Sequence, residues 1–485
     1  MILPSCETIE KLSADYSVVP LCKEVYADAL TPIALLKGLL AKSKRVFLLE
    51  SVEGGEKWGR YSFLGFDPVI RVTAKNGKVT IQSGDSKSVK ESADPYESIR
   101  EILAEHTAPK IEGLPPFAGG FVGYFAYAMI EYAEPSLNIK RGNFDDMDVM
   151  LFERIIAYDH LKQKISIVIN MKTDKVLENY GRTCEELEAV AAMIREPVAP
   201  VSEERSQPQF TCDVTQEEYC RNIERVKRHI VEGDIFQLVY SRQFRAPYEG
   251  SLINAYRVLR TTNPSPYMVY MNFDGDEIVS TSPETLVRLE GKKLYTFPVA
   301  GSRPRGKANA EDERLESELM SDAKELAEHD MLVDLGRNDL GRISKFGTVE
   351  VTEYQMIHKY SHIMHMCSQV EGEVRDECDG LSAIKAVLPA GALSGAPKIR
   401  ACEIIEDIET EPRGVYGGAL GYIDFAGNMD TCIAIRMAAK KDGYVYVQAG
   451  SGIAADSVAE SEYRESGNKA AAIIDAIERA GEVDE

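Results

Sequence analysis

The chain has 485 residues, of which 44% are hydrophobic and 28% are charged. This balance supports a substantial core and argues against global disorder. At roughly 150 residues per domain, the length suggests about three units or two large ones. The formal net charge of −22 argues against binding to nucleic-acid phosphates or to an anionic membrane surface. The net charge does not exclude binding of a small anionic substrate, because the local electrostatic field at the site decides whether such a substrate binds.

The start of the chain lacks a basic segment followed by an apolar one, so we expect no secretory peptide. The most apolar window, residues 117–130, is shorter than the about 20 residues that a membrane-spanning helix needs. The nine cysteines are scattered without a CxxC pair, which indicates reduced thiols and neither a disulfide framework nor a zinc ribbon. We therefore expect a soluble, cytoplasmic protein.

The first part of the chain mixes strands and helices. We expect strands at residues 46–49 and 165–169 and a helix at residues 176–195. Residues 196–209, with three prolines and several Ser and Glu, are typical of a linker. The predicted organisation is an N-terminal domain of residues 1–195, a linker of residues 196–212 and a C-terminal domain of residues 213–485.

The second part begins with a helix at residues 213–232, where Thr215 is the expected N-cap and Glu217 and Glu218 lie in the first turn. Strands and helices then alternate. The expected strands are residues 267–273, 294–299, 418–424 and 444–449, and the expected helices are residues 310–320, 322–335, 399–408 and 461–480. No internal repeat and no phosphate-binding glycine signature appears, so nucleotide binding is not expected.

Two of these helices place carboxylates on one face. Glu325 and Glu328 are three residues apart, Glu462 and Glu465 repeat that spacing, and Lys469 follows one turn later. Carboxylates that face each other across a cleft are costly unless a cation joins them, and Mg²⁺ suits one or two carboxylates with waters and an anionic substrate. Glutamates at this spacing are also common on solvated helix faces, so spacing alone leaves both interpretations open.

Histidines gather between residues 329 and 365. Alternation over residues 357–370 predicts one strand, with His358 and His362 on one face and His365 on the other. Three ligands on one face are not supplied, so a zinc site is not expected. A single histidine of near-neutral pKa can serve as a general acid or base, and a hydrogen-bonded, half-buried histidine is the alternative.

Glycine-rich segments are dense in the last third of the chain, at residues 391–398, 414–418 and, after an expected strand, 450–452. Backbone N–H groups in such loops can hold an oxyanion, and Arg436 can bind a carboxylate bidentately. A tight turn between strands is the alternative for each loop. Together with the carboxylates, these elements indicate a site for a small polyanionic substrate and a cation.

Several long motifs follow one another in a recognisable order. They are Leu48-Leu49-Glu50-Ser51 and residues 58–65, 263–268, 300–305 and 333–340, together with the Glu325–Glu328 helix and the glycine loops. With them the chain resembles component I of anthranilate synthase, in the chorismate-utilising enzyme family, over nearly its full length. The resemblance implies an α+β fold in which antiparallel sheets pack against helices, with a chorismate cleft between the sheets.

The resemblance also implies roles for single residues. Glu284 matches the acid that protonates the departing 4-hydroxyl of chorismate, and His365 matches a histidine associated with elimination of pyruvate. Glu328 and Glu465 match ligands of Mg²⁺, with Glu325 and Glu462 in support. The residues implied to bind the substrate are Gly301, Ser302, Tyr416, Arg436, Gly450, Ser451, Gly452, Lys469 and Gln237.

The implied reaction is Mg²⁺-dependent amination of chorismate at C2 and elimination of pyruvate to give anthranilate, the first step of tryptophan biosynthesis. Gln237 stands where water-adding relatives carry a base lysine, and Ala300 stands where aminodeoxychorismate synthases typically carry a lysine nucleophile. Met268 agrees with the anthranilate branch. Ala392 departs from the family's usual Thr, which would lose a hydrogen bond worth roughly 1 kcal/mol unless water or Ser394 substitutes.

Partners and regulation follow from the same resemblance. The chain has no evident glutaminase cysteine paired with a downstream histidine, so we expect a separate glutamine amidotransferase subunit, component II, to supply ammonia. Ser51, Pro266, Tyr267 and Met268 match the family's tryptophan-binding pocket, which implies feedback inhibition by L-tryptophan at a separate site. The alternatives are an aminodeoxychorismate synthase component I and a non-catalytic amino-acid-sensing paralogue.

Overall fold

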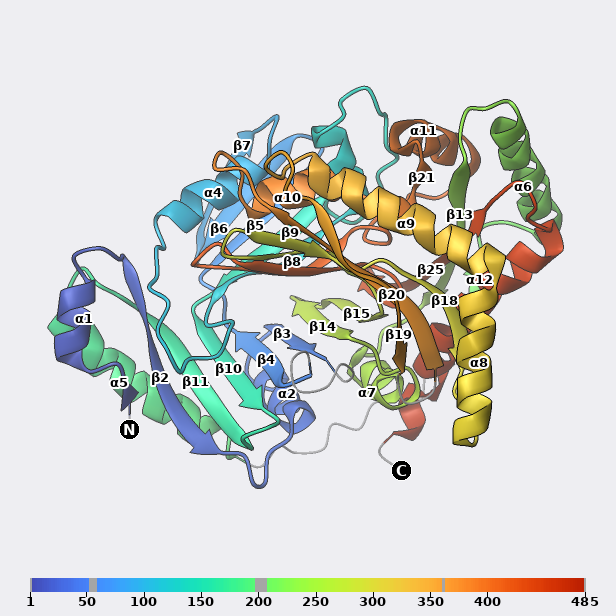
Figure 1. The fold of residues 1–485 in the computed structure, drawn as a ribbon. Helices are drawn as coiled ribbons and strands as arrows, with labels where there is room; N and C mark the ends of the chain where they lie inside the picture. Colours follow the sequence, from blue (N-terminus) through green and yellow to red (C-terminus); the bar gives the residue numbers. More distant parts are fainter. Residues whose placement is uncertain (1, 52–58, 197–206, 360–362, 484–485) are drawn as a thin grey trace.

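The computed structural model describes residues 2–51, 59–196, 207–359 and 363–483. Two antiparallel β-sheets lie face to face, and helices cover their outer faces (Figure 1). This arrangement confirms the expected α+β class. Within the described residues, no helix is both long and apolar enough to cross a lipid bilayer. Trp58 of the second motif, His362 and most of the predicted linker lie outside the described residues.

The first sheet runs from β2 at the lower left to β13 at the upper right of Figure 1, and each strand is antiparallel to its neighbours. Its strands, in spatial order, are β1 (Ile2–Leu3), β2 (Val18–Tyr26), β11 (Lys164–Lys172), β10 (Arg154–Asp159), β4 (Tyr61–Phe66), β3 (Arg45–Glu50), β14 (Tyr267–Phe273), β15 (Asp276–Ser282), β24 (Met437–Lys441), β25 (Tyr444–Ile453), β13 (Gln237–Pro247) and β12 (Thr211–Cys212), with β21 (Gly395–Ala396) paired to β13.

The second sheet packs above the first and is also antiparallel throughout. Its strands, in spatial order, are β18 (Val299–Pro304), β20 (Ile363–Glu373), β17 (Lys293–Thr296), β16 (Thr285–Glu290), β23 (Met429–Ile433), β22 (Ala419–Asp424), β8 (Gly120–Phe125), β9 (Met147–Phe152), β5 (Ile70–Lys75), β6 (Lys78–Ser83) and β7 (Ser86–Glu91), with β19 (Glu350–Lys359) paired to β20.

Most of the helices pack against strands of the two sheets. They are α1 (Cys6–Leu12), α2 (Pro32–Leu40), α4 (Tyr96–Ala104), α5 (Val176–Met193), α6 (Gln216–Val231), α7 (Ile253–Thr262), α8 (Asn309–Ser321), α9 (Ala323–Gly341), α10 (Gly380–Val387), α11 (Lys398–Ile408) and α12 (Ala459–Glu478), with short 3₁₀ turns η1 (Tyr127–Tyr132), η2 (Gly391–Leu393) and η3 (Arg479–Glu482). Helix α9 packs on β17, β18 and β20, and α12 packs on β25.

Both sheets take strands from both sides of the predicted linker. In the first sheet β3 pairs with β14, with Leu49 opposite Val269. In the second sheet β8 pairs with β22, with Gly123 opposite Gly421. The N-terminal and C-terminal parts therefore do not form separate sheets, and backbone hydrogen bonds tie them together.

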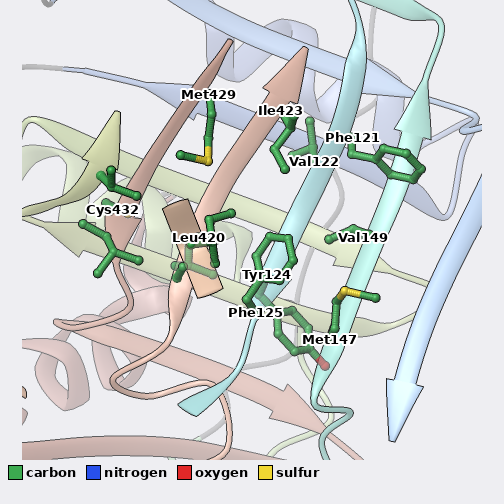
Figure 2. Close-up of a cluster of buried hydrophobic side chains, with 14 of the residues drawn as sticks. Phe121, Val122, Tyr124, Phe125, Met147, Val149, Leu420, Ile423, Met429 and Cys432 are labelled. Atoms are coloured by element: carbon green, nitrogen blue, oxygen red, sulfur yellow. The ribbon is translucent and has the colours of Figure 1, made fainter. Parts of the chain in front are cut away.

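The main hydrophobic cluster fills the space between the sheets. Figure 2 shows part of it, where Phe125 and Tyr124 of β8 lie beside Met147 of β9, with residues of β22 and β23 nearby. The ring of Phe47 in the first sheet meets the ring of Phe152 in the second edge to face, with centroids 4.7 Å apart. Since aromatic pairs bury large apolar areas, these contacts hold the two sheets together.

A second cluster lies on the other face of the first sheet. Leu36 of α2, Leu187 of α5, Leu259 of α7 and Ile473 of α12 are buried there against the strands. Each helix thus presents one apolar stripe to the sheet, as helical periodicity predicts. The first sheet is consequently buried on both faces over most of its width.

The sequence located most elements well. Helix α6 begins where it was expected, because Thr215 and Glu218 form a reciprocal capping box. The expected strand at residues 294–299 is divided, since β17 ends at Thr296 and β18 begins at Val299. Residues 450–452 lie inside β25 and do not follow it.

The prediction of one strand over residues 357–370 is wrong. The segment holds the end of β19 and most of β20, which run antiparallel with His358 opposite His365. Residues that pair directly in this way point to the same face of a sheet. His358 and His365 therefore share one face, whereas the single-strand prediction placed them on opposite faces. His358 is largely exposed, whereas His365 is half-buried.

Candidate active site

A cavity of about 670 Å³ lies where the two sheets meet helices α9 and α12. Strand ends, loops and helices from distant parts of the sequence form its wall. The predicted site residues that line it are Gln237, Glu284, Gly301, Ser302, Glu328, His365, Tyr416, Arg436, Gly450, Gly452, Glu462, Glu465 and Lys469. The fold therefore brings most of the sequence-predicted catalytic, substrate-binding and metal-binding residues to one place.

Strands β18 and β20 bring a backbone carbonyl and an imidazole together. Ser302 pairs with His365 across the strands, and Nδ1 of His365 lies 3.4 Å from the carbonyl oxygen of Gly301. Burial lowers the pKa of His365, so the imidazole is neutral near pH 7 and can accept a proton. Gly301 has φ +70°, and a Cβ there would lie 2.9 Å from Leu319 and 3.1 Å from Glu325 Oε2.

Glu284 lies in the connection between β15 and β16. Its carbonyl oxygen accepts a hydrogen bond from the backbone N–H of Ile433 at 3.0 Å, which fixes the main chain at this point. Burial raises the pKa of the Glu284 carboxyl group to about 8. The group is therefore protonated at neutral pH and can act as a general acid.

Carboxylates from two helices face the cavity. Glu328 of α9 and Glu465 of α12 both line it. Burial raises the pKa of Glu328, and the negative charges of Glu325 and Glu465 raise it further. Glu465 also lies 2.7 Å from the ammonium of Lys469. Crowded oxygen donors of this kind match the ligand preference of a hard divalent cation.

Two predicted residues lie outside the cavity wall. Glu325 is turned to Arg303, whose Nη1 lies 3.2 Å from its Oε1. Ser451 is buried in β25, where its hydroxyl lies 3.4 Å from the carbonyl oxygen of Glu462 and 3.4 Å from the hydroxyl of Tyr219. Glu325 therefore acts on the cavity through its charge, and Ser451 supports the strand.

Another part of the wall, at Arg436, suits an anion. Burial lowers the pKa of Arg436, which still leaves its guanidinium charged at neutral pH, and within the described residues no carboxylate lies within 4.0 Å of it. Its backbone has φ +47°, and its carbonyl oxygen accepts a hydrogen bond from the N–H of Thr281 at 3.0 Å. Tyr416 lines the same region of the wall. A guanidinium without a protein carboxylate is a ready partner for a substrate carboxylate.

The structure adds residues that the sequence analysis did not single out. Ala327, Met331 and Leu332 form an apolar wall on α9, and Gln448 of β25 adds an amide. Their helical spacing beside Glu328 was visible in the sequence, but only the position of α9 shows that they face a cavity. This wall offers contact for a small ring beside the charged groups.

Ala392 lines the cavity where the family usually has Thr. Ser394 does not replace the missing hydroxyl, because it is fully buried and its Oγ donates to the carbonyl oxygen of Ala390 at 2.9 Å. Ser394 is therefore not the substitute, and replacement of the hydroxyl by a water stays a prediction.

A second cavity of about 720 Å³ is lined by residues of both sheets, among them the start of β14. Ser51, Pro266, Tyr267 and Met268 all line it, as does Glu50, which pairs with Arg260. In the described part of the chain, no residue lines both this cavity and the first one. The four residues predicted to form a separate effector site therefore surround one cavity.

Comparison with known proteins identifies the family. The family model described as chorismate binding enzyme matches residues 45–475. The chain belongs to this family. Anthranilate synthase component 1 of Acetivibrio thermocellus is 44% identical over 497 residues, covering 100% of both chains. The component 1 protein of Aquifex aeolicus is 42% identical, covering 99% of each.

Solved structures of the chorismate-binding family share the fold. Anthranilate synthase component I of Streptococcus pneumoniae is 36% identical, with a TM-score of 0.76 over 87% of this chain and 95% of that one. The menaquinone-specific isochorismate synthase of Escherichia coli is 18% identical, with a TM-score of 0.71 over 97% and 98% of the two chains, which shows the fold alone. The resemblance expected from the motifs is confirmed, and the chain is a chorismate-utilising enzyme.

Proposed function

We propose that this chain is the large subunit of an anthranilate synthase. It binds chorismate, adds ammonia at C2 with loss of the 4-hydroxyl, and eliminates pyruvate to give anthranilate. The main support is one cavity that joins a protonated carboxyl group, a neutral imidazole, neighbouring carboxylates and a guanidinium with no carboxylate partner among the described residues. The full-length similarity to proteins named anthranilate synthase component 1 supports the same reaction.

Each side chain has a distinct part in this reaction. Hydroxide is a poor leaving group, so Glu284 donates the proton that lets the C4 oxygen depart as water. His365 is neutral and lies near the same cavity wall, where it assists the later elimination of pyruvate. Arg436 and Tyr416 hold the enolpyruvyl carboxylate, and the apolar wall of α9 orients the ring.

Glu328 and Glu465 are the residues that would hold Mg²⁺. Their carboxylates line one cavity, and burial, with the nearby charges of Glu325 and Glu465, raises the pKa of Glu328; this donor set suits the ion. When bound, Mg²⁺ neutralises the ring carboxylate of chorismate and fixes its orientation. Calorimetry should detect Mg²⁺ binding to the wild type, and Glu465→Gln should weaken it about ten-fold or more. Equal Mg²⁺ affinity in both proteins would contradict this assignment.

The product decides between the anthranilate and aminodeoxychorismate reactions. Purified chain, chorismate, Mg²⁺ and ammonium at alkaline pH should yield anthranilate, identified by its mass and fluorescence. A 4-amino product would instead support the folate-branch alternative, and no consumption of chorismate would support a non-catalytic paralogue. Ala300, which lines the cavity and offers no amine, supports direct attack by ammonia.

Glutamine should serve as nitrogen source only when a separate amidotransferase subunit is present. The reason is that the chain shows no evident glutaminase cysteine and histidine pair. The test compares glutamine-dependent with ammonia-dependent rates for the purified chain. Equal rates without a second subunit would overturn this part of the proposal.

Feedback inhibition by L-tryptophan is proposed for the second cavity. Its volume of about 720 Å³ and its lining by Ser51, Pro266, Tyr267 and Met268 support a site for an amino acid with a large side chain. Titration with L-tryptophan should raise the KM for chorismate, and D-tryptophan serves as the control. No change in chorismate affinity would remove the claim.

A further inference from the structure

A buried arginine lies directly behind the wall of the active-site cavity. The side chain of Arg413 is only 1% exposed. Its guanidinium donates to both carboxylate oxygens of Glu409, at 2.6 and 2.8 Å. It also donates to the carbonyl oxygens of Leu393, at 2.5 Å, and Val239, at 2.8 Å. The charge is therefore compensated, and four of the five N–H groups donate hydrogen bonds.

These contacts join separate segments of the cavity wall. Leu393 belongs to η2, Val239 belongs to β13, and both line the cavity. Arg413 itself stands three residues before Tyr416, whose backbone N–H donates to the Arg413 carbonyl oxygen at 3.1 Å. The guanidinium carbon lies 5.8 Å from the centre of the Tyr416 ring. One cation thus contacts three pieces of the wall around the proposed carboxylate grip.

Glu409 extends the network to a fourth segment. Its Oε1 accepts hydrogen bonds from the N–H and the hydroxyl of Ser241, both at 2.8 Å. The Ser241 oxygen in turn accepts a hydrogen bond from the side-chain amide of Gln448 at 2.8 Å. Gln448 lines the cavity, whereas Ser241 does not. The direction of each bond therefore fixes which way the Gln448 amide points.

Arginine is the side chain suited to this position. Its planar fork offers five N–H donors in fixed directions, whereas lysine offers three donors around a single point. A buried ion pair alone is weak evidence for stability, because desolvation offsets much of the attraction. This pair is bonded to the backbone of two cavity-lining segments and is adjacent to a third. Its position therefore affects the arrangement of the cavity wall.

We propose that Arg413 is a positioning residue for the substrate. Its side chain holds Val239 and Leu393 by direct hydrogen bonds and lies over the ring of Tyr416. Through Glu409 and Ser241 it also holds the Gln448 amide, in the arrangement that binds the enolpyruvyl side of chorismate. The inference rests on the proposed function of this cavity. It adds to that proposal a group that never touches the substrate.

The main test is Arg413→Lys, which keeps the charge and removes the fork. The KM for chorismate should rise about ten-fold or more, while kcat changes less, because misplaced binding groups weaken substrate binding first. The matched control is Arg71→Lys. Arg71 pairs with buried Asp148 at 2.5 Å, away from the cavity wall. It should lose thermal stability similarly and leave the KM unchanged.

Ser241→Ala is a milder second variant that acts through the same network. It should raise the KM for chorismate about three-fold, since it removes the bond from the Gln448 amide nitrogen, keeps only the 3.4 Å bond from Gln243 to the Gln448 oxygen, and leaves Arg413 bonded. If Arg413→Lys does not fold, Ser241→Ala decides alone. An active wild type with unchanged KM in the folded variants overturns the inference and leaves the proposed function intact. A wild type that does not turn over chorismate overturns the proposed function, and this inference with it.

Discussion

At the scale of single residues, burial sets the chemistry of the cavity. Glu284 owes its raised pKa to burial, and His365 owes its lowered pKa mainly to the same cause. One environment therefore keeps an acid protonated and a base neutral at the same pH. The sequence identified both residues through family motifs, but it contains no signal for their burial. Only the folded cavity explains why a glutamate can serve as an acid near neutral pH.

Replacing Glu284 with glutamine should lower turnover by about 10²–10⁴-fold, the usual contribution of a general acid. In the wild type, kcat/KM for chorismate should fall as pH rises through about 8, because the carboxyl group then loses its proton. Rates measured at a constant concentration of unprotonated ammonia isolate this alkaline decrease in kcat/KM. A Glu284→Gln variant that keeps both the wild-type rate and the alkaline decrease would exclude Glu284 as the acid.

The same substitution should stabilise the protein at alkaline pH. The folded state holds the Glu284 proton more tightly than the unfolded state, so the free energy of unfolding decreases as pH rises from about 4.5 to about 8. Glutamine has no proton to lose. We expect the Tm of Glu284→Gln to exceed that of the wild type at pH 9 and to approach it at pH 5. A constant difference in Tm across this range would contradict the shift.

At the scale of elements, local signals located the helices and failed at one hairpin. The capping box of α6 and the apolar stripe of α12 depend on near neighbours in sequence, which a single chain reveals. The reversal between β19 and β20 went unnoticed because the alternation over residues 357–370 predicts a single strand. The contacts of Arg413 were equally hidden, since its partners Leu393 and Val239 are close only in the fold.

Gly301→Ala tests how β18 is fitted to α8 and α9. The new Cβ would lie 2.9 Å from Leu319 at a φ of +70°, so we expect a loss of about 1–3 kcal/mol in the free energy of unfolding and a raised KM for chorismate. Gly77→Ala is the matched control, because Gly77 has φ +73° and its Cβ would meet only Ser92 O at 3.9 Å. Urea unfolding of both variants separates the cost of the close contact with Leu319 from the cost of backbone strain. Equal losses in the free energy of unfolding would mean that Leu319 moves and relieves the contact.

At the scale of the whole molecule, the two parts of the chain are joined by strand pairs between residues that are distant in sequence. The sequence predicted the α+β class and the linker composition, but not that β3 would pair with β14 or β8 with β22. Such pairings join residues more than 200 positions apart, and no local pattern records them. The predicted linker at residues 196–212 does not separate two independent sheets, because each sheet contains strands from before and after it.

Residues 1–195 expressed alone should not fold stably. Without β14 and β22, the edges of β3 and β8 and the apolar face around Phe47 would be left unpaired. The full chain should unfold in urea in one transition, seen alike by far-UV circular dichroism and by tyrosine fluorescence. A cooperative transition of the isolated fragment would show that the two parts are independent.

Shared sheets also constrain how such genes can recombine. A crossover between the genes of two relatives within residues 196–212 falls in the predicted linker, so an alignment alone would suggest that it leaves both parts of the protein intact. It would nevertheless join a β3 and a β8 from one parent to a β14 and a β22 from the other. Every facing side chain along both seams would then come from a different ancestor, so viable hybrids should exchange paired strands together.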